Sequence, residues 1–215
     1  NGLVLGGTAS GVGKTIATLA VSRALSDAGY DPVPAKAGPD YIDPSHHAAA
    51  LGRPSRTLDT WMQGVDGVRR NLARGAEDAG DDAVAVVEGM MGLYDGSVTS
   101  TAATAAALDV PVVLVVDAGA GMQSVGATAL GFREYAAHVD LPPAVIDAVD
   151  DPRVDVAGVL AQQAHAGRHA EGIRESLPAG IDWVGHVPPA DELTVPDRHL
   201  GLHMGDEHPI DESAI

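Results

Sequence analysis

The chain of 215 residues contains no cysteine, which excludes disulfides, thiolate metal sites and a cysteine nucleophile. Aromatic residues make up only 3% of it, so much of the apolar content is alanine and valine. It also lacks any apolar run of about 18 residues and any signal-peptide pattern. We therefore expect no membrane-spanning segment and a cytoplasmic location.

Positive charge is scarce as well, with 13 Lys and Arg against 30 Asp and Glu and a net charge of −17. Such a surface repels nucleic acids and anionic membranes, so neither is an expected partner. Lysine occurs only twice, as Lys14 and Lys36. A halophilic source is the favoured interpretation, because acidity alone does not explain the missing lysines. Molar salt, with a Debye length of about 3 Å, would make the high like charge tolerable. An ordinary acidic cytosolic protein would explain only the acidity.

Short β-branched runs alternate with alanine-rich helical stretches, which predicts one α/β domain with a mainly parallel sheet flanked by helices. The length suits one such domain and is short for two. We expect an extended loop at 140–155. Strands are predicted at 3–5, 32–36, 83–88, 111–117, 156–160 and 183–187, and helices at 14–28, 65–79, 99–108, 122–138 and 168–177.

In a parallel sheet the loops after the carboxyl ends of the strands form the ligand crevice. Residues 6–15, 37–44, 89–96 and 118–121 are such loops, and they hold most of the unusual residues of the chain. Both lysines fall at this edge. The sequence therefore predicts a single site there.

The first of these loops, GGTASGVGKT at 6–15, follows a strand and opens a helix, which is the context of a phosphate-binding P-loop. Lys14 is expected to reach the β- and γ-phosphate oxygens, and the Thr15 hydroxyl to bind Mg²⁺. A chance glycine-rich turn is the alternative. Partitioning ATPases carry an extra lysine where this chain has Ala9, and no third lysine exists for a guanine-binding motif. The expected ATP-binding residues are Ser10, Gly11, Val12, Gly13, Lys14 and Thr15.

Carboxylates follow two further strands. Asp40 and Asp43 lie in KAGPDYIDP, where two prolines restrict the backbone, and Glu88 ends a buried strand. Carboxylates beside a phosphate loop typically hold Mg²⁺, and a buried acid is costly unless it is paired or bound to metal. Capping of helix ends by the two aspartates, and a structural role for Glu88, are the alternatives.

Other polar residues near this edge allow two interpretations each. Asp95 either orients a substrate or forms a turn, and Asp117 either caps a loop or binds a ligand. The nine histidines, including the pair His46 and His47, show no spacing typical of a structural zinc site. We expect them at the surface or in a substrate loop.

Five segments together resemble the cobyrinic acid a,c-diamide synthase family, whose members are amidotransferases of cobalamin biosynthesis. They occur in the expected order and span most of the chain, from the phosphate loop to residue 203. The segments are GTASGVGKT (7–15), KAGPDYIDPSHH (36–47), GRPSRTLDTW (52–61), EGMMGLYDG (88–96) and VPDRHLGLH (195–203).

The resemblance implies a P-loop NTPase fold of the dethiobiotin-synthetase-like type that uses ATP and Mg²⁺ to amidate the a and c carboxylates of a corrinoid. Each carboxylate would form an acyl phosphate that ammonia displaces. Transferred by motif, the catalytic residues are Lys14, Lys36, Asp43 and Asp95, and the Mg²⁺ ligands are Thr15, Asp40 and Glu88. Lys36 would neutralise the transferring phosphoryl group. The residues expected to contact the corrinoid are Tyr41, His46, Arg53, Arg56, Leu93 and Tyr94.

Two departures from the family pattern matter. Family members continue into a glutaminase domain with a cysteine nucleophile, and this chain has neither the length nor a cysteine. We therefore expect residues 1–215 to form the synthetase domain alone, with ammonia free or supplied through a glutaminase domain or subunit outside the chain. The family's Asn-Arg-Val stretch is replaced by Ala161–His165, which leaves the contacts to the nucleotide base and the nucleotide preference open.

Several functions remain open from the sequence. The substrate could instead be hydrogenobyrinic acid or a nickel sirohydrochlorin, since no sequence feature distinguishes the central metal of the tetrapyrrole. Dethiobiotin synthetase shares the loop, but the GPDYIDP and LYDG segments argue against it. A non-catalytic nucleotide-binding regulator would fit the phosphate loop and leave the acidic loops unexplained. A homodimer is expected only by analogy with the family.

Overall fold

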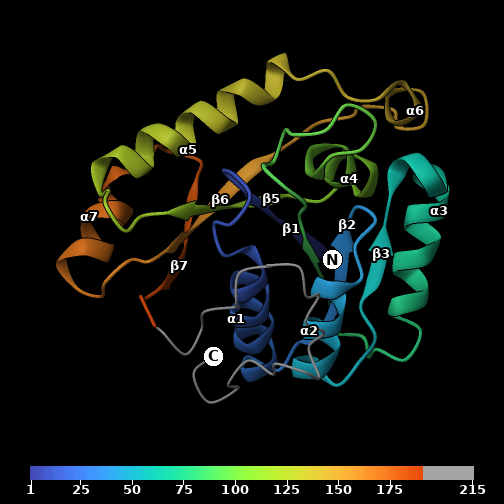
Figure 1. Ribbon diagram of the computed structural model, residues 1–215, viewed down its shortest axis with the longest axis horizontal. Coiled ribbons are helices and arrows are strands. Elements are labelled where there is room, and N and C mark those ends of the chain that lie inside the picture. The colour runs from blue at the N-terminus through green and yellow to red at the C-terminus, as the bar shows by residue number, and fades with distance from the viewer. Residues whose placement is uncertain (191–215) are drawn as a thin grey trace, which may run out of the picture.

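The computed structural model describes residues 1–190, and these form one sheet covered by helices on both faces (Figure 1). The sheet has seven strands in the order β3-β2-β4-β1-β5-β6-β7, and every neighbouring pair is parallel. The predicted α/β class with a mainly parallel sheet is confirmed. The strands are β1 (Gly2–Gly7), β2 (Asp31–Ala37), β3 (Arg56–Leu58), β4 (Ala83–Glu88), β5 (Val112–Asp117), β6 (Val156–Gln162) and β7 (Asp182–Val187).

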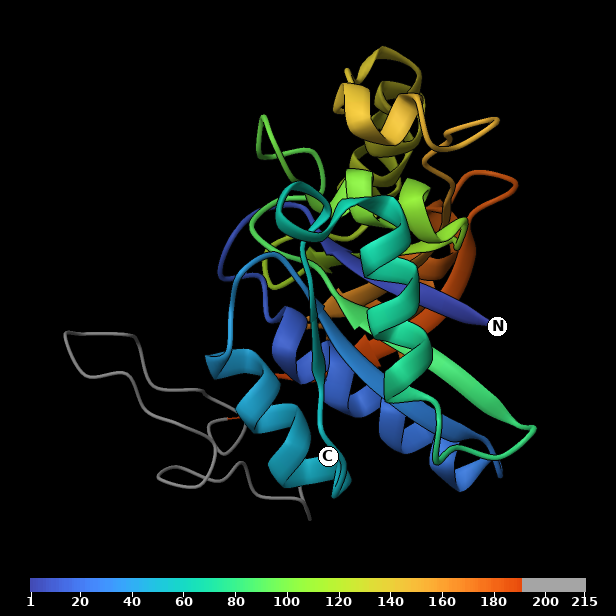
Figure 2. The ribbon, with the colours of Figure 1, turned by 90° about the vertical axis from the view of Figure 1, so that its right-hand side faces the viewer.

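The helices divide between the two faces. α1 and α2 lie together on one side, while α3, α4, α5 and α7 cover the other (Figures 1 and 2). Connections that return to a parallel neighbour through a helix produce this layered arrangement. The helices are α1 (Lys14–Asp27), α2 (Ile42–Leu51), α3 (Thr60–Gly75), α4 (Thr101–Leu108), α5 (Gln123–Tyr135), α6 (Pro143–Ile146) and α7 (Arg168–Ser176), with a 3-10 turn at Ala136–His138.

Successive strand residues serve opposite faces of the sheet. In β1, Val4 packs with the larger core beneath α3, α4, α5 and α7, and its neighbour Leu5 packs with Ile16 and Ala17 of α1. Both strand residues are completely buried. A parallel strand that is covered on both faces needs an almost continuous apolar run, which is why the short runs of this sequence predict the strands well.

Helix α4 lies close to the sheet because it consists of alanine, threonine and one leucine. Its small side chains are buried on every side, with Ala102 and Ala105 facing the sheet and Ala103 facing α3 and α6. The predicted extended loop at 140–155 is partly wrong, because it contains the short helix α6. Val145 of α6 is fully buried against the α4 face, so burial of one apolar side chain organises this segment.

Two elements beside the site were not predicted. Residues 37–44 were expected to be a loop throughout, yet α2 begins at Ile42 and includes Asp43 and Pro44 in its first turn. Proline is tolerated there because the first-turn N–H groups have no partner within the helix. Strand β3 was missed because only three residues pair with β2.

Helix α3 also differs from the prediction at 65–79. It begins at Thr60 and ends at Gly75, and Gly64 breaks the regular helix with φ 65. The side chain of Asp59 accepts hydrogen bonds from the backbone N–H groups of Trp61 and Met62, which stabilises the added first turn. The family segment at 195–203 lies outside the described residues. Among the helices of residues 1–190, none combines the length and apolarity that a membrane crossing requires.

Candidate functional site

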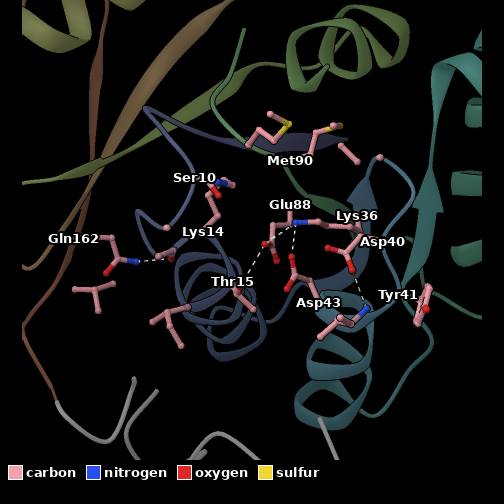
Figure 3. A pocket seen from close by; sticks show the side chains of 18 of the residues that line it. Ser10, Lys14, Thr15, Lys36, Asp40, Tyr41, Asp43, Glu88, Met90 and Gln162 are labelled. Carbon is pink, nitrogen blue, oxygen red and sulfur yellow. Dashed lines mark hydrogen bonds and ion pairs between the residues drawn. The ribbon is translucent and has the colours of Figure 1, made fainter. Parts of the chain in front are cut away.

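A cleft of about 900 Å³ opens at the carboxyl edge of the central strands. Its walls come from the loops after β1, β2, β4 and β6, so the expectation of one site at this edge agrees with the structure (Figure 3). The charged residues that line it are Lys14, Lys36, Asp40, Asp43 and Glu88. These residues lie up to 74 positions apart in the sequence and converge because parallel strands place their carboxyl ends together.

The phosphate loop has the backbone that its glycines predict. Gly11 and Gly13 adopt φ values of 80 and 84, in the left-handed region that other residues avoid. Gly13 caps α1 without a side-chain hydrogen bond, and the first turn of α1 contains no acidic residue. The N–H groups and dipole of this helix end therefore favour an anion such as phosphate.

Lys14 lies at the start of α1 and points across the loop, where its Nζ donates to the carbonyl of Ala9 at 3.1 Å. Burial lowers its pKa, and the positive charge of Lys36 lowers it further. Burial and Lys36 both disfavour the charged form of Lys14, and a bound anion would stabilise that form electrostatically. Val12, by contrast, does not line the cleft and packs with the apolar cluster under α1.

Gln162, at the end of β6, forms a side-chain hydrogen bond to the backbone of the phosphate loop. Its Nε2 donates to the carbonyl of Gly13 at 2.8 Å, and its side chain is almost fully buried. A Cβ added at Gly13 would lie 3.0 Å from the amide of Gln162, whereas one added at Gly11 would meet no atom within 4 Å. The segment predicted to shape the base pocket thus also supports the phosphate loop.

Gly13→Ala is expected to destabilise the protein more than Gly11→Ala. Both changes force alanine into the left-handed region, at about 1–2 kcal/mol, but only the first also presses on Gln162. Denaturant unfolding of the two variants and of the double variant Gly13→Ala/Gln162→Ala measures the difference. Equal losses of unfolding free energy in the two single variants would show that the Gln162 side chain moves aside without cost and does not stabilise the loop.

Glu88 is the centre of the polar network and is 1% exposed. Its Oε1 accepts from the Thr15 hydroxyl at 3.0 Å and from Lys36 Nζ at 2.9 Å, and its Oε2 lies 2.6 Å from Nε2 of His47 (Figure 3 shows the first two). Burial alone would raise its pKa, but Lys36 and then His47 outweigh burial and lower it. Glu88 is therefore ionised despite its burial.

Lys36 joins the phosphate loop to helix α2. Its Nζ lies 2.6 Å from Asp43 Oδ2 and donates to the Gly89 carbonyl at 3.0 Å, besides its bond to Glu88. Burial opposes its charge, yet Glu88 and Asp43 raise its pKa overall. The pKa of Asp43 is raised too, first by burial and then by the negative charge of Glu88, against the opposing effect of Lys36. One cation thus holds two buried carboxylates.

The donor set fits Mg²⁺ carried by a nucleotide. Among the described residues no three His, Cys, Asp or Glu side chains are arranged to hold a metal ion by themselves. Mg²⁺ usually takes one or two protein oxygens and completes its octahedron with phosphates and water, at about 2.0–2.1 Å. Adjacent ligands of such an octahedron are about 2.9 Å apart, and the oxygens of Thr15 and Glu88 are separated by 3.0 Å.

The loop after β2 supplies further groups to the cleft. Asp40 lines it, and its Oδ1 accepts from the backbone N–H of Ile42 at 2.9 Å, which fixes the turn into α2. Tyr41 lines it as well and is 66% exposed. Both are placed where a ligand can meet them, and their roles stay predictions. His46 is buried in α2 and does not line the cleft.

Other predicted substrate residues lie elsewhere, and the structure gives the reason for each. Arg53 pairs with Asp31 at 2.9 Å, and the stem of Arg56 lies against the position of Gly75. Leu93 is completely buried in the core. Of the described residues that line the cleft, none is among these three, so their expected contact with a corrinoid there does not agree with this geometry.

Tyr94 and Asp95 serve the loop after β4 rather than the cleft wall. The Tyr94 hydroxyl donates to the Phe132 carbonyl at 2.5 Å, and this bond attaches the loop to α5. Burial raises the pKa of Tyr94 to about 12. Asp95 is exposed and accepts a hydrogen bond from the Gly92 N–H at 3.0 Å. Of the two interpretations offered by the sequence, this contact agrees with a turn-forming role. Its charge still acts on Lys14 electrostatically.

Two residues of the site are not apparent from the sequence, namely His47 and, in its direct contact with the phosphate loop, Gln162. His47 was expected at the surface or facing a substrate, yet it is completely buried against Glu88. Its position four residues after Asp43 places both on one helix face, but that signal exists only once α2 is recognised. Met90 and Met91 also line the cleft and were not singled out.

The family model of the CobQ/CobB/MinD/ParA nucleotide binding domain matches residues 3–202, which is most of the chain. The chain belongs to this family. Membership of a nucleotide-binding family accounts for both the phosphate loop and the fold. The prediction of a P-loop nucleotide-binding fold is confirmed by this match.

Individual relatives agree with the resemblance in the motifs. Cobyrinate a,c-diamide synthase of Halobacterium salinarum is 64% identical over 215 residues, and that of Haloarcula marismortui is 59% identical over 214 residues. Hydrogenobyrinate a,c-diamide synthase of Thermobifida fusca is 39% identical over 211 residues. The first two sources are halophiles, which fits the salt-adapted composition.

The alignments cover 100% of this chain for the first two relatives and 95% for the third, but only 45%, 45% and 41% of those proteins. The chain thus spans less than half the length of the curated relatives that it matches.

Proposed function

We propose that residues 1–215 are the ATP-dependent synthetase part of a cobyrinate a,c-diamide synthase. The observation that carries this proposal is the shared cleft of the phosphate loop and the acidic loop after β2, which Lys36 and Glu88 link at 2.6–3.0 Å. A nucleotide regulator needs only the first of these loops. A ligase needs both, because the acceptor carboxylate must meet the terminal phosphate.

Bound ATP supplies the phosphoryl group that activates the substrate carboxylate. Within the chain, Lys14 and the N–H groups at the start of α1 would bind the phosphates, and Thr15 and Glu88 would hold Mg²⁺. Lys36 presents positive charge between the two loops while Asp43 fixes its position. Asp40 and Tyr41 line the same cleft, where Asp40 would be a further Mg²⁺ ligand and Tyr41 would contact the substrate. The buried charges keep their geometry during transfer, as electrostatic stabilisation requires.

The choice of substrate rests on the relatives. Two cobyrinate enzymes are 64% and 59% identical to the chain, whereas a hydrogenobyrinate enzyme is 39% identical. This favours amidation of the a and c carboxylates of cobyrinate in cobalamin biosynthesis. We propose further that a glutaminase outside residues 1–215 provides the ammonia, and that the enzyme acts in the cytoplasm, with a homodimer as the family analogy suggests.

An end-point assay at high potassium chloride tests the proposal. The chain is incubated with cobyrinate, ATP, Mg²⁺ and ammonium, and products are followed by mass spectrometry. Two successive carboxylate-to-amide mass changes with formation of ADP are expected, and under the same conditions Lys14→Ala should give no detectable product. Tight Mg²⁺-dependent ATP binding without amidation of cobyrinate or hydrogenobyrinate would contradict the proposal and favour a nucleotide-sensing domain.

A further inference from the structure

Helix α2 is attached to the buried charge cluster at two points. Asp43 and His47 are four residues apart and therefore lie one above the other on the same face. The first contacts Lys36 at 2.6 Å, and the second contacts Glu88 at 2.6 Å. The cluster thus alternates acid and base from Asp43 through Lys36 and Glu88 to His47. Neither attachment belongs to the phosphate loop.

The hydrogen-bond pattern fixes the role of His47. Nε2 of His47 lies 2.6 Å from Oε2 of Glu88, and an imidazole N–H in this place donates to the carboxylate oxygen. Nδ1 lies 3.0 Å from the Ser55 hydroxyl, which can either donate to the ring nitrogen or accept from it and so holds the ring from its other side. His47 has no exposed surface, and the imidazole ring cannot turn without breaking both bonds.

The two oxygens of Glu88 are thereby divided between different partners. Oε2 faces His47, and Oε1 remains beside the hydroxyl of Thr15. Without His47, Glu88 would be held by Thr15 and Lys36 through Oε1 alone, and its carboxylate group could rotate about that oxygen. In metalloenzymes, removing a group that orients a metal ligand in this way typically lowers the metal affinity by about 10–100-fold.

We propose that His47, held by Ser55, is a positioning residue that orients Glu88 for Mg²⁺ and fixes α2, and with it Asp40 and Asp43, relative to the phosphate loop. This inference rests on the proposed function, because it takes Glu88 as a ligand of nucleotide-borne Mg²⁺. His47 itself touches neither substrate nor nucleotide. Its removal therefore changes how Mg²⁺ binds rather than whether phosphate binds.

The test measures binding and needs no turnover. The affinity of a non-hydrolysable ATP analogue is determined by calorimetry with and without Mg²⁺, and the ratio of the two affinities is the readout. His47→Ala is expected to lower this ratio about tenfold, while the Mg²⁺-free affinity stays within about twofold. His47→Gln, whose amide can donate to Glu88, should recover part of the ratio, and Ser55→Ala should lower it less than His47→Ala. His138→Ala, an exposed histidine outside the cleft, is the control.

The variant Glu88→Gln separates the role of Glu88 as a Mg²⁺ ligand from the positioning role of His47. If Glu88→Gln abolishes the Mg²⁺ effect and His47→Ala leaves it unchanged, the positioning role is wrong and the metal assignment stands. If Glu88→Gln leaves the effect unchanged, the metal assignment and the positioning role are both wrong. An equal loss of affinity with and without Mg²⁺ in His47→Ala would indicate a structural role only and would also overturn the proposal. Circular dichroism confirms folding, and the Gln and Ser55 variants provide the answer if His47→Ala does not fold.

Discussion

Replacing Lys36 with methionine is expected to lower the free energy of unfolding by about 3–5 kcal/mol. The change removes the cation from a site where its own side chain is 4% exposed and its partners Asp43 and Glu88 are 9% and 1% exposed. Two negative charges would then remain buried close together, with His47 as the remaining partner of Glu88. Breaking a buried pair in this way is costly because the surviving charge is left uncompensated.

Arg53→Met is the matched control for this measurement. Arg53 pairs with Asp31 at the same 2.9 Å separation that joins Lys36 to Glu88, but its side chain is 20% exposed and that of Asp31 is 39% exposed. Solvent-screened pairs contribute about 0–1 kcal/mol, so the control should lose little. The double variant Lys36→Met/Glu88→Gln should be more stable than Lys36→Met alone, because it removes one of the stranded charges. Equal losses for Lys36→Met and Arg53→Met would contradict the account.

The pH dependence of stability gives an independent check of Lys36. Its pKa is raised in the folded protein above the ordinary 10.5, so its contribution is fully present below 10.5 and is lost as the pH rises through the raised pKa. Glu88 behaves in the opposite sense. Its pKa is lowered, so its contribution is present above the ordinary 4.5 and is lost as the pH falls through the lowered value. Lys36→Met should therefore lack the alkaline loss of stability that the unchanged chain shows.

Lys14→Ala is expected to reduce the proposed ATP-dependent amidation by about 10²–10³-fold without loss of stability. Lys14 is the other lysine of the chain, but its environment lowers its pKa through burial and the nearby charge of Lys36. A lysine with a lowered pKa makes the folded state less favourable while it is protonated, so its removal relieves a cost. We expect the free energy of unfolding to stay within about 1 kcal/mol or to rise.

Turnover and denaturant unfolding, measured on the same preparations of Lys14→Ala and Lys36→Met, check this contrast. Lys14→Arg serves as a second control, because it keeps the charge but replaces the compact ammonium. A large loss of stability in Lys14→Ala would show that its bond to Ala9 supports the loop structurally. Unchanged turnover in Lys14→Ala would remove the phosphate-binding role and with it the proposed chemistry.

The phosphate loop and the sheet were predictable from the sequence because both depend on local patterns. Gly11 and Gly13 are needed for a left-handed backbone, and the buried strands require continuous apolar runs. Helix α2 was not predictable in the same way. Pro39 and Pro44 suggest a loop, and only the packing of α2 against α1 and β2 makes a helix of residues that include Pro44.

The sequence by itself determined the α/β class, the nucleotide-binding loop, and the convergence of Lys14, Lys36, Asp43 and Glu88 at one edge, because strand order and chain direction place such residues together. Only the tertiary structure decided which neighbours each side chain has. It buried His47 against Glu88, joined Gln162 to Gly13, and directed Arg53 and Tyr94 away from the cleft. Such contacts join residues 22 to 149 positions apart, and their energies depend on burial, which no local pattern encodes.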